Sequence, residues 1–237
     1  MSRNRRVAGE PAYVLRRQPY RETSLLLELF TRGHGRIGLV ARGARRGKAA
    51  LATELQAFRP LLADWQQRGE LGTLTGAEPG GRLLPLRGDA VYCGWYLNEL
   101  LLRLLQRDDP HEDLFEDYAE ALGGLAEGVL EPSLRRFEKR LLDGTGYGLD
   151  LPDDLRPTAV YRYDWELGPV LDAAADPGYT GAGLIALRDG GPISAEHLPE
   201  AKRLLRAALK RVLGDRELES VRAIREVRRL TQANRQA

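Results

Sequence analysis

The first third of the chain alternates short apolar runs with turn-forming residues. Pro19 marks a turn after the first run, and the segment TRGHG places two glycines after the second. Such spacing is typical of strands in a small antiparallel barrel or sandwich. Pro60 lies inside the fourth run, where a proline indicates an edge position or a bulge. The five expected strands cover residues 12–17, 24–30, 36–42, 55–65 and 70–78.

After residue 88 the apolar positions recur every three or four residues, which predicts helices. Pro132 fits the first turn of the third helix. The expected helices cover residues 89–106, 111–128 and 131–146, with two more between 198 and 230 that are divided by Gly214-Asp215.

Residues 150–195 are rich in Pro and Gly and interrupt the helices. Within them, TAVYRYDWELGPV predicts a hairpin that turns near residues 166–168. The pattern therefore predicts an α+β protein of two domains: a five-stranded domain over residues 1–80, and a helical domain over 81–237 with the insert at about 150–195.

Charge is distributed unevenly along a chain whose overall net charge is only +2. Residues 1–80 hold 13 Arg and one Lys against six Glu and one Asp, an excess of seven positive charges, whereas the remainder carries −5. A basic N-terminal part suggests that this part meets a polyanion. Arginine-rich codon usage explains the number of arginines, but it does not explain their segregation.

Composition also limits the class of protein. The single cysteine, Cys93, excludes an intrachain disulfide and a Cys-rich zinc site, and fits a reducing, cytoplasmic setting. The basic N-terminus lacks the apolar segment of a signal peptide. The most apolar run, residues 95–105, is too short and too polar to span a membrane, so we expect no membrane association.

The segment LVARGARRGKAAL at residues 39–51 concentrates positive charge between two expected strands. A phosphate-binding P-loop needs four residues between its glycines and a hydroxyl after the lysine. Here three residues separate Gly43 from Gly47, and Ala49 follows Lys48, so a P-loop is excluded. A loop along a nucleic-acid backbone remains, with a solvated turn as the alternative. The candidate phosphate contacts are Arg42, Arg45, Arg46 and Lys48, with Arg21, Arg32 and Arg36 as expected neighbours.

Other candidate chemistry is weaker. The three histidines are isolated, and no Ser-His-Asp, Cys-His or carboxylate cluster can be assembled, so we expect no catalytic site. Arginines on the last helix form either a second basic surface or a solvated face. Aromatic residues that could stack on bases are Tyr13, Tyr20, Phe30, Phe58 and Trp65. Among them Phe30 and Phe58 fit a core better, and Tyr20 is the best exposed candidate.

Four segments in this order resemble the bacterial RecO family of DNA repair proteins. They are AYVLRRQPYRETSLLLELFTRGHGRIGLVARGARRGKAAL, LQAFRPLLADW, LRRFEKRLLDGTGYGLDL and RLLRAALKRVLGDRELES. The resemblance implies an N-terminal OB-fold barrel and a helical C-terminal domain. It implies a non-enzymatic, cytoplasmic and nucleoid-associated recombination mediator that binds single- and double-stranded DNA and anneals strands. It further implies partners: RecR, the acidic tail of the single-stranded DNA-binding protein, and, indirectly, the RecA recombinase.

Many members of this family carry four cysteines that bind a structural zinc in the region after the third helix. This chain has none there, so we expect a metal-free protein with no cofactor, in which Tyr161, Tyr163, Trp165 and Tyr179 pack in place of the metal. For the acidic tail we expect a hydrophobic pocket with a basic rim on the helical domain, supplied by Arg135, Arg136 and Lys139. The alternatives to a recombination mediator are a magnesium-dependent nucleic-acid enzyme and a protein-interaction module without physiological DNA binding.

Overall fold

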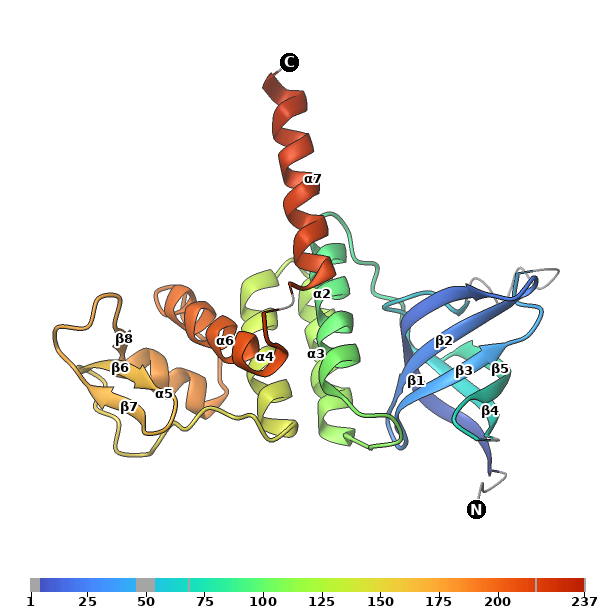
Figure 1. The fold of residues 1–237 in the computed structure, drawn as a ribbon, viewed down its shortest axis with the longest axis horizontal. Helices are drawn as coiled ribbons and strands as arrows, with labels where there is room; N and C mark the ends of the chain where they lie inside the picture. Colours follow the sequence, from blue (N-terminus) through green and yellow to red (C-terminus); the bar gives the residue numbers. More distant parts are fainter. Residues whose placement is uncertain (1–4, 46–53, 68, 216, 237) are drawn as a thin grey trace. The chain divides into compact units, whose positions relative to one another are not determined.

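The computed structural model describes residues 5–45, 54–67, 69–215 and 217–236, and the side chains of residues 228 and 230–236 are not described. The chain forms two compact units (Figure 1). The first comprises residues 1–126 together with 218–237, and the second comprises residues 127–217. The first unit thus contains the last helix as well as the N-terminal strands.

Five strands close into a barrel in the first unit, in the order β1-β2-β3-β5-β4 (Figure 1). Neighbouring strands are antiparallel except β3 and β5, which are parallel. This is the OB-fold expected from the sequence. The strands are β1 (Arg5–Tyr20), β2 (Ser24–Thr31), β3 (Gly35–Ala41), β4 (Leu61–Gln67) and β5 (Gly72–Pro79).

Apolar residues of every strand fill the barrel, as the alternation within each run predicts. Ala44 and Leu55, on either side of the loop between β3 and β4, belong to the same core. Both ends of that loop are therefore fixed in the barrel. Trp65 is also buried here, so it offers no surface for stacking.

Two helices follow the barrel in the first unit, α2 (Asp89–Leu104) and α3 (Glu112–Ala126). Asn98 of α2 donates a hydrogen bond from Nδ2 to the carbonyl of Leu15, 3.0 Å away, and accepts one from the hydroxyl of Tyr118. Tyr13 and Phe30 of the barrel pack against aromatic rings of α3. Tyr13 and Phe30 are thus buried, and neither is available to stack on a base.

The second unit contains α4 (Leu130–Gly144), α5 (Gly181–Asp189) and α6 (Leu198–Leu213). It also contains a sheet in the order β7-β6-β8, formed by β6 (Val160–Asp164), β7 (Gly168–Leu171) and β8 (Tyr179–Thr180). The hairpin β6–β7 matches the expected one. Helix α5 and strand β8 were not expected from the Pro- and Gly-rich sequence.

The last helix, α7 (Glu219–Gln236), belongs to the first unit, where it packs on α2. The compact units therefore divide the chain differently from the expected boundary at residue 80, because α2, α3 and α7 pack with the barrel. The expected boundary at residue 80 coincides instead with the end of β5 at Pro79.

Two strand boundaries also differ from the expectation. β1 begins seven residues earlier than residue 12, because its polar first half pairs with β4. β4 begins at Leu61 and not at 55, because residues before Pro60 leave the strand conformation. Phe58 there has φ +66°, which interrupts an extended run.

Candidate nucleic-acid interface

One end of the barrel gathers three of the candidate cations. The register pairs Tyr20 with Ser24 and Leu25 with Ala41, so the turn between β1 and β2 lies beside the end of β3. Arg21 stands in that turn and Arg42 directly follows β3. We call this region, defined by Arg21, Arg42 and Arg45, the basic end.

Arg45 ties the segment after β3 to the turn between β1 and β2. Its backbone amide donates to the carbonyl of Thr23 at 2.9 Å, and its guanidinium Nη1 lies 3.4 Å and 3.3 Å from the carbonyls of Arg21 and Glu22. These acceptors are neutral carbonyls, so the bonds do not offset the charge of the Arg45 side chain.

The sequence of this segment explains its shape. Gly43 has φ +69°, a left-handed conformation that glycine adopts without strain, and this turns the chain at the end of β3. Ala44 then enters the barrel core, which leaves Arg42 and Arg45 on either side of it exposed to solvent. Arg46 and Lys48, the other two predicted contacts, lie outside the described residues.

The return of the loop adds a cation that the sequence analysis missed. Arg17, near the end of β1, donates from Nη1 to the carbonyl of Leu55 at 3.3 Å. Arg21 lies over the ring of Tyr20, with its Cζ 5.2 Å from the ring centroid. The sequence around Arg17 predicts only a strand with polar ends. Placing Arg17 beside the loop also requires knowing how the strands pair.

Arg32 and Arg36 lie at the opposite end of the barrel, so the expectation that they neighbour the loop is wrong. Arg36 is the second residue of β3 and Arg42 follows its end, a separation of about 20 Å for six residues of strand. Arg32 forms ion pairs with Glu112 at 2.8 Å and Glu116 at 3.1 Å on α3.

Arg36 is occupied in a similar way. It pairs with Glu28 at 3.7 Å and donates to the carbonyl of Leu102 on α2. Burial lowers the pKa of Arg36; the charge of Glu28 opposes this shift and that of Arg107 adds to it. Both arginines therefore hold α2 and α3 against the barrel.

The predicted partner-binding residues lie on α4 in the second unit, but two of them are buried. Arg135 is only 2% exposed and pairs with Glu138 at 2.7 Å. Lys139 is also buried and pairs with Asp143 at 2.5 Å. Arg136 alone of the three is exposed. The three line one hollow together with Arg140 and Leu187, but its volume of about 10 Å³ holds no more than a water molecule.

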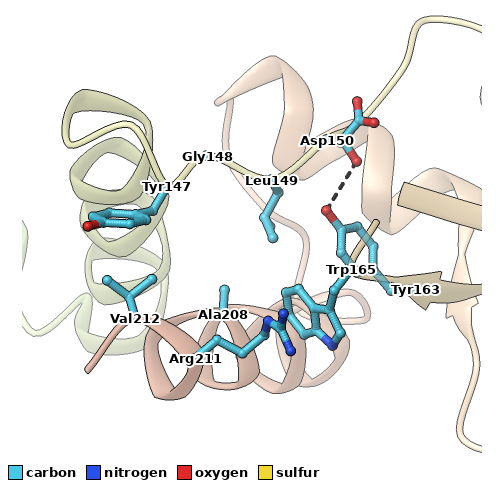
Figure 2. Close-up of a pocket in the computed structure, with 9 residues that line it drawn as sticks. All are labelled: Tyr147, Gly148, Leu149, Asp150, Tyr163, Trp165, Ala208, Arg211 and Val212. Carbon is cyan, nitrogen blue, oxygen red and sulfur yellow. Dashed lines mark hydrogen bonds between the residues drawn. The ribbon is translucent and has the colours of Figure 1, made fainter. Parts of the chain in front are cut away.

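A larger pocket of about 520 Å³ lies elsewhere in the second unit (Figure 2). Arg211 of α6 stacks over the ring of Trp165, with Cζ 5.0 Å from the centroid. Tyr163 donates from its hydroxyl to the carbonyl of Asp150 at 3.3 Å, and burial raises the pKa of this hydroxyl, so it stays a neutral donor. Leu149, Tyr147 and Val212 supply apolar surface. Sequence reasoning did not find this pocket, because its lining comes from three separate segments.

The aromatic residues of the insert form contacts with one another and with nearby polar groups. Tyr163 and Trp165 meet edge to face at 5.0 Å, and Tyr161 is buried with its hydroxyl accepting from the amide of Arg156. Arg203 lies over Tyr179 at 4.3 Å.

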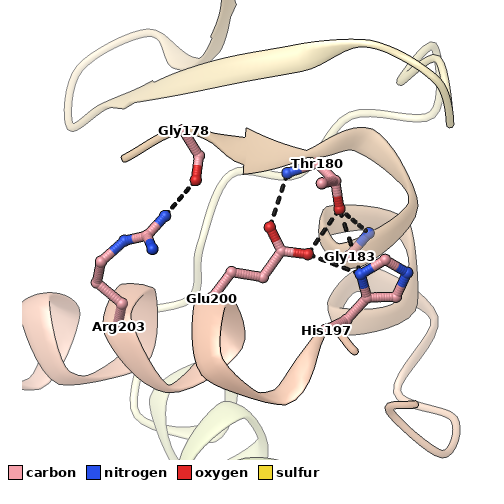
Figure 3. A network of polar contacts seen from close by, with 6 residues as sticks. All are labelled: Gly178, Thr180, Gly183, His197, Glu200 and Arg203. Carbon is pink, nitrogen blue, oxygen red and sulfur yellow. Dashed lines mark hydrogen bonds and ion pairs between the residues drawn. The ribbon is translucent and has the colours of Figure 1, made fainter. Parts of the chain in front are cut away.

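His197 lies in a network of polar contacts with Thr180 and Glu200, and these contacts are structural (Figure 3). Glu200 accepts hydrogen bonds from the amide and the hydroxyl of Thr180 at 2.7 Å and 2.6 Å. The same hydroxyl accepts from the amide of Gly183 and caps α5. Because the Thr180 hydroxyl donates to Glu200, His197 is not its base, so the three residues do not form a nucleophile triad.

Two kinds of feature are absent from the described residues. No group of three or more His, Cys, Asp or Glu side chains among them is placed to hold a metal ion. None of the helices in the described ranges combines the length and apolarity needed to cross a membrane.

Comparison with known proteins identifies the family. Residues 7–81 match the model of the Recombination protein O N terminal region, and residues 86–166 match that of the Recombination protein O C terminal region. A DNA repair protein RecO from Aromatoleum aromaticum is 46% identical over 97% of this chain and 100% of its own length. The proteins of the same name from Alkalilimnicola ehrlichii and Methylococcus capsulatus are each 46% identical, over 96% and 91% of this chain and 95% and 92% of their own lengths. The chain belongs to the RecO family of DNA repair proteins, with a role in DNA repair and recombination.

Proposed function

We propose that the protein binds single- and double-stranded DNA through the basic end of its barrel and acts at the nucleoid as a recombination mediator, not as an enzyme. In this role it anneals complementary strands. With RecR it assists the loading of the RecA recombinase onto DNA coated by the single-stranded DNA-binding protein. The observation that carries the proposal is the bonding of Arg45 to the turn between β1 and β2, which gathers Arg21, Arg42 and Arg45 at one end of an OB-fold.

The chemistry of this end suits a phosphate backbone. Exposed arginines neutralise phosphates and release condensed counterions, which gives affinity without sequence preference. Arg46 and Lys48 remain part of the proposal as the next cations along the loop. Arg32 and Arg36 are assigned to the ion pairs that hold the helices.

The salt dependence of binding tests the site. If about four phosphates are neutralised, the slope of log K against log [salt] on single strands is about −3. The double variant Arg42→Glu with Arg45→Glu should weaken binding to all sequences about equally and flatten the slope to about −1.4. A matched control, Arg162→Glu with Lys210→Glu, makes the same charge change in the second unit. An unchanged slope in the first variant would move the DNA site away from the basic end.

A magnesium-dependent nucleic-acid enzyme is the rival from another class. Labelled single strands incubated with magnesium, with and without ATP, distinguish the two. Annealing without cleavage or ATP hydrolysis supports the mediator, whereas cleaved strands would support the enzyme. Loss of all DNA binding by the unaltered protein at moderate salt would favour a protein-interaction module.

For the acidic and hydrophobic tail of the single-stranded DNA-binding protein, we propose the 520 Å³ pocket of the second unit. An apolar side chain fits the surface of Leu149 and Val212, and Arg211 at the edge can pair with a carboxylate. Arg135 and Lys139 are buried in ion pairs and cannot form a rim, so Arg136 is the predicted rim residue that remains accessible.

A further inference from the structure

Trp95 is a large aromatic side chain exposed on the surface of the first unit. It lies on α2 and is 44% exposed, whereas Trp65 is buried in the barrel. Its ring meets that of Phe58 at a centroid distance of 5.2 Å and an interplanar angle of 70°. An exposed tryptophan that packs against an aromatic neighbour is typical of a binding surface.

The backbone around this pair is specialised. Phe58 has φ +66°, a conformation that bulky residues rarely adopt and that usually costs free energy. Gly94, next to Trp95, makes room for the Phe58 ring, because a Cβ atom at this position would lie 2.7 Å from Cε1 of Phe58. The packing of Phe58 against α2 therefore depends on the unusual backbone conformation of Phe58 itself and on the missing side chain of Gly94.

The aromatic pair lies beside the middle of β1, about 20 Å of strand from the basic end, because Ala57, next to Phe58, pairs with Val14, which precedes Tyr20 by six residues. Phe58 follows Leu55 by three residues, at most about 10 Å, and the Leu55 carbonyl is bonded to Arg17. The direction of α2 shows which end of the barrel Trp95 faces. The carbonyl of Leu102, in its last turn, is bonded to Arg36 at the opposite end of the barrel, so the first half of α2, which carries Trp95, points toward the basic end.

We propose that Trp95, supported by Phe58, is a base-stacking platform for single-stranded nucleic acid whose phosphates lie on the basic end of the barrel. The inference rests on the proposed DNA-binding function and adds the residue that selects for single strands. Every base has an aromatic face that an indole can stack on, whatever the sequence. In a duplex those faces are covered by neighbouring bases, so Trp95 gains nothing from double-stranded DNA. The occupant is therefore an unpaired base.

Binding of matched oligonucleotides to the full chain tests this role. The probes are a fluorescein-labelled oligothymidylate, a duplex of equal length, and an abasic oligomer of the same phosphate number, each followed by anisotropy. Trp95→Ala should weaken oligothymidylate binding by about 5- to 150-fold, the range expected for one stacked base, and leave duplex binding within about twofold. Trp95→Phe should retain most of the affinity. The matched control is Leu171→Ala, which removes an exposed apolar side chain of β7 in the second unit, outside the pocket.

The abasic oligomer makes the test independent of the folding of the variant. The unaltered protein should bind it with the reduced affinity that Trp95→Ala shows for oligothymidylate, and Trp95→Ala should bind both alike. Equal affinity of the unaltered protein for abasic and thymidine oligomers would overturn the proposal. So would a parallel loss of single-strand and duplex binding in a Trp95→Ala protein with unchanged circular dichroism. If the unaltered protein binds no nucleic acid at all, the proposed function fails first and the stacking role fails with it.

Discussion

Glu99 of α2 accepts three hydrogen bonds from the first two residues of α7. Its carboxylate receives the amide of Glu219 at 2.9 Å, and the amide and the hydroxyl of Ser220 at 2.8 Å and 2.7 Å. These amides lie at the start of α7, where backbone donors lack partners within the helix. A side chain from another helix therefore caps α7 and joins the C-terminus of the chain to the first unit.

This cap makes the attachment of α7 dependent on pH. Burial alone would raise the pKa of Glu99, but the hydrogen bonds from Ser220 and Glu219 and the charge of Arg103 lower it overall. A carboxyl whose pKa is lower in the folded state stabilises the fold above its ordinary pKa. That contribution is lost as the pH falls through the folded value.

We therefore expect Glu99→Gln to reduce stability at neutral pH by about 1 kcal/mol, the typical value of a helix cap. The difference from the unaltered protein should shrink as the pH falls below about 4.3. Urea unfolding between pH 7 and pH 3 measures the difference, and amide exchange of α7 localises it. Glu120→Gln, an exposed carboxylate on α3, is the control. A difference that stays constant over this range would contradict the capping role.

The buried pair of Arg135 and Glu138 on α4 gives a second prediction. Both side chains are nearly inaccessible, with Glu138 0% exposed. Removing Glu138 leaves the buried Arg135 with the longer ion pair to Glu131 at 3.6 Å, and breaking a buried ion pair typically costs about 3–5 kcal/mol. We expect Glu138→Ala to lower the free energy of unfolding by that amount in urea titrations. Arg136→Ala on the exposed side of α4 should change it by less than about 0.5 kcal/mol.

The same pair also affects how binding data for Arg135 are interpreted. A combined Arg135→Met and Glu138→Leu variant removes both charges and should be much closer to the unaltered protein in stability. If it binds an acidic peptide normally while Arg135→Ala does not, then Arg135 acts through the stability of α4 and not through contact with the peptide.

Much of this fold follows from local sequence pattern. Alternation within short runs predicts the five strands, and three-to-four periodicity predicts α2, α3, α4, α6 and α7. Helix α5 was not predicted, because its first turn contains Gly181 and Gly183, and glycines so close together are typical of a loop. Its start depends on the hydroxyl of Thr180, and that hydroxyl is held by Glu200, 20 residues away. A contact of that separation leaves no periodic signal.

The candidate site shows more clearly that contacts between distant segments cannot be predicted from local sequence pattern. The charge of the loop at residues 39–51 is evident from the sequence, but its neighbours depend on strand register. Because Leu25 pairs with Ala41, Arg21 lies beside the loop and Arg36 lies at the opposite end of the barrel. Helical periodicity marks Trp95 as an apolar position without showing that the barrel leaves it exposed.

The pocket at Arg211 gives a third prediction, which rests on the proposed binding of an acidic tail. A labelled peptide with several acidic residues and an apolar C-terminal residue should bind the second unit within the full chain. Arg211→Glu should weaken it by more than tenfold, because it replaces attraction of the carboxylate by repulsion. Arg136→Glu should have an effect below about threefold if α4 is peripheral. A loss confined to Arg136→Glu would return the tail to the predicted rim on α4.

The last prediction concerns Asn98 and Tyr118, which connect α2 and α3 at the barrel. The Tyr118 hydroxyl donates to Oδ1 of Asn98 at 2.5 Å, and Nδ2 of Asn98 donates to the carbonyl of Leu15. Burial raises the pKa of Tyr118 well above its ordinary value, so the hydroxyl remains a neutral donor at any physiological pH. Both partners are buried, and water cannot replace a lost bond without a rearrangement.

We expect Asn98→Ala to destabilise the protein by about 1–3 kcal/mol in urea unfolding, because buried polar groups on β1 and α3 lose a partner. Tyr118→Phe should cost less, since it removes the donor itself and leaves a smaller polar imbalance. In a double-mutant cycle the two changes should cost less together than the sum of each alone, because they remove one shared hydrogen bond. Strict additivity would mean that the two side chains stabilise the fold independently. The cycle thus measures the strength of the hydrogen bond that joins α3 to α2 through Tyr118 and Asn98.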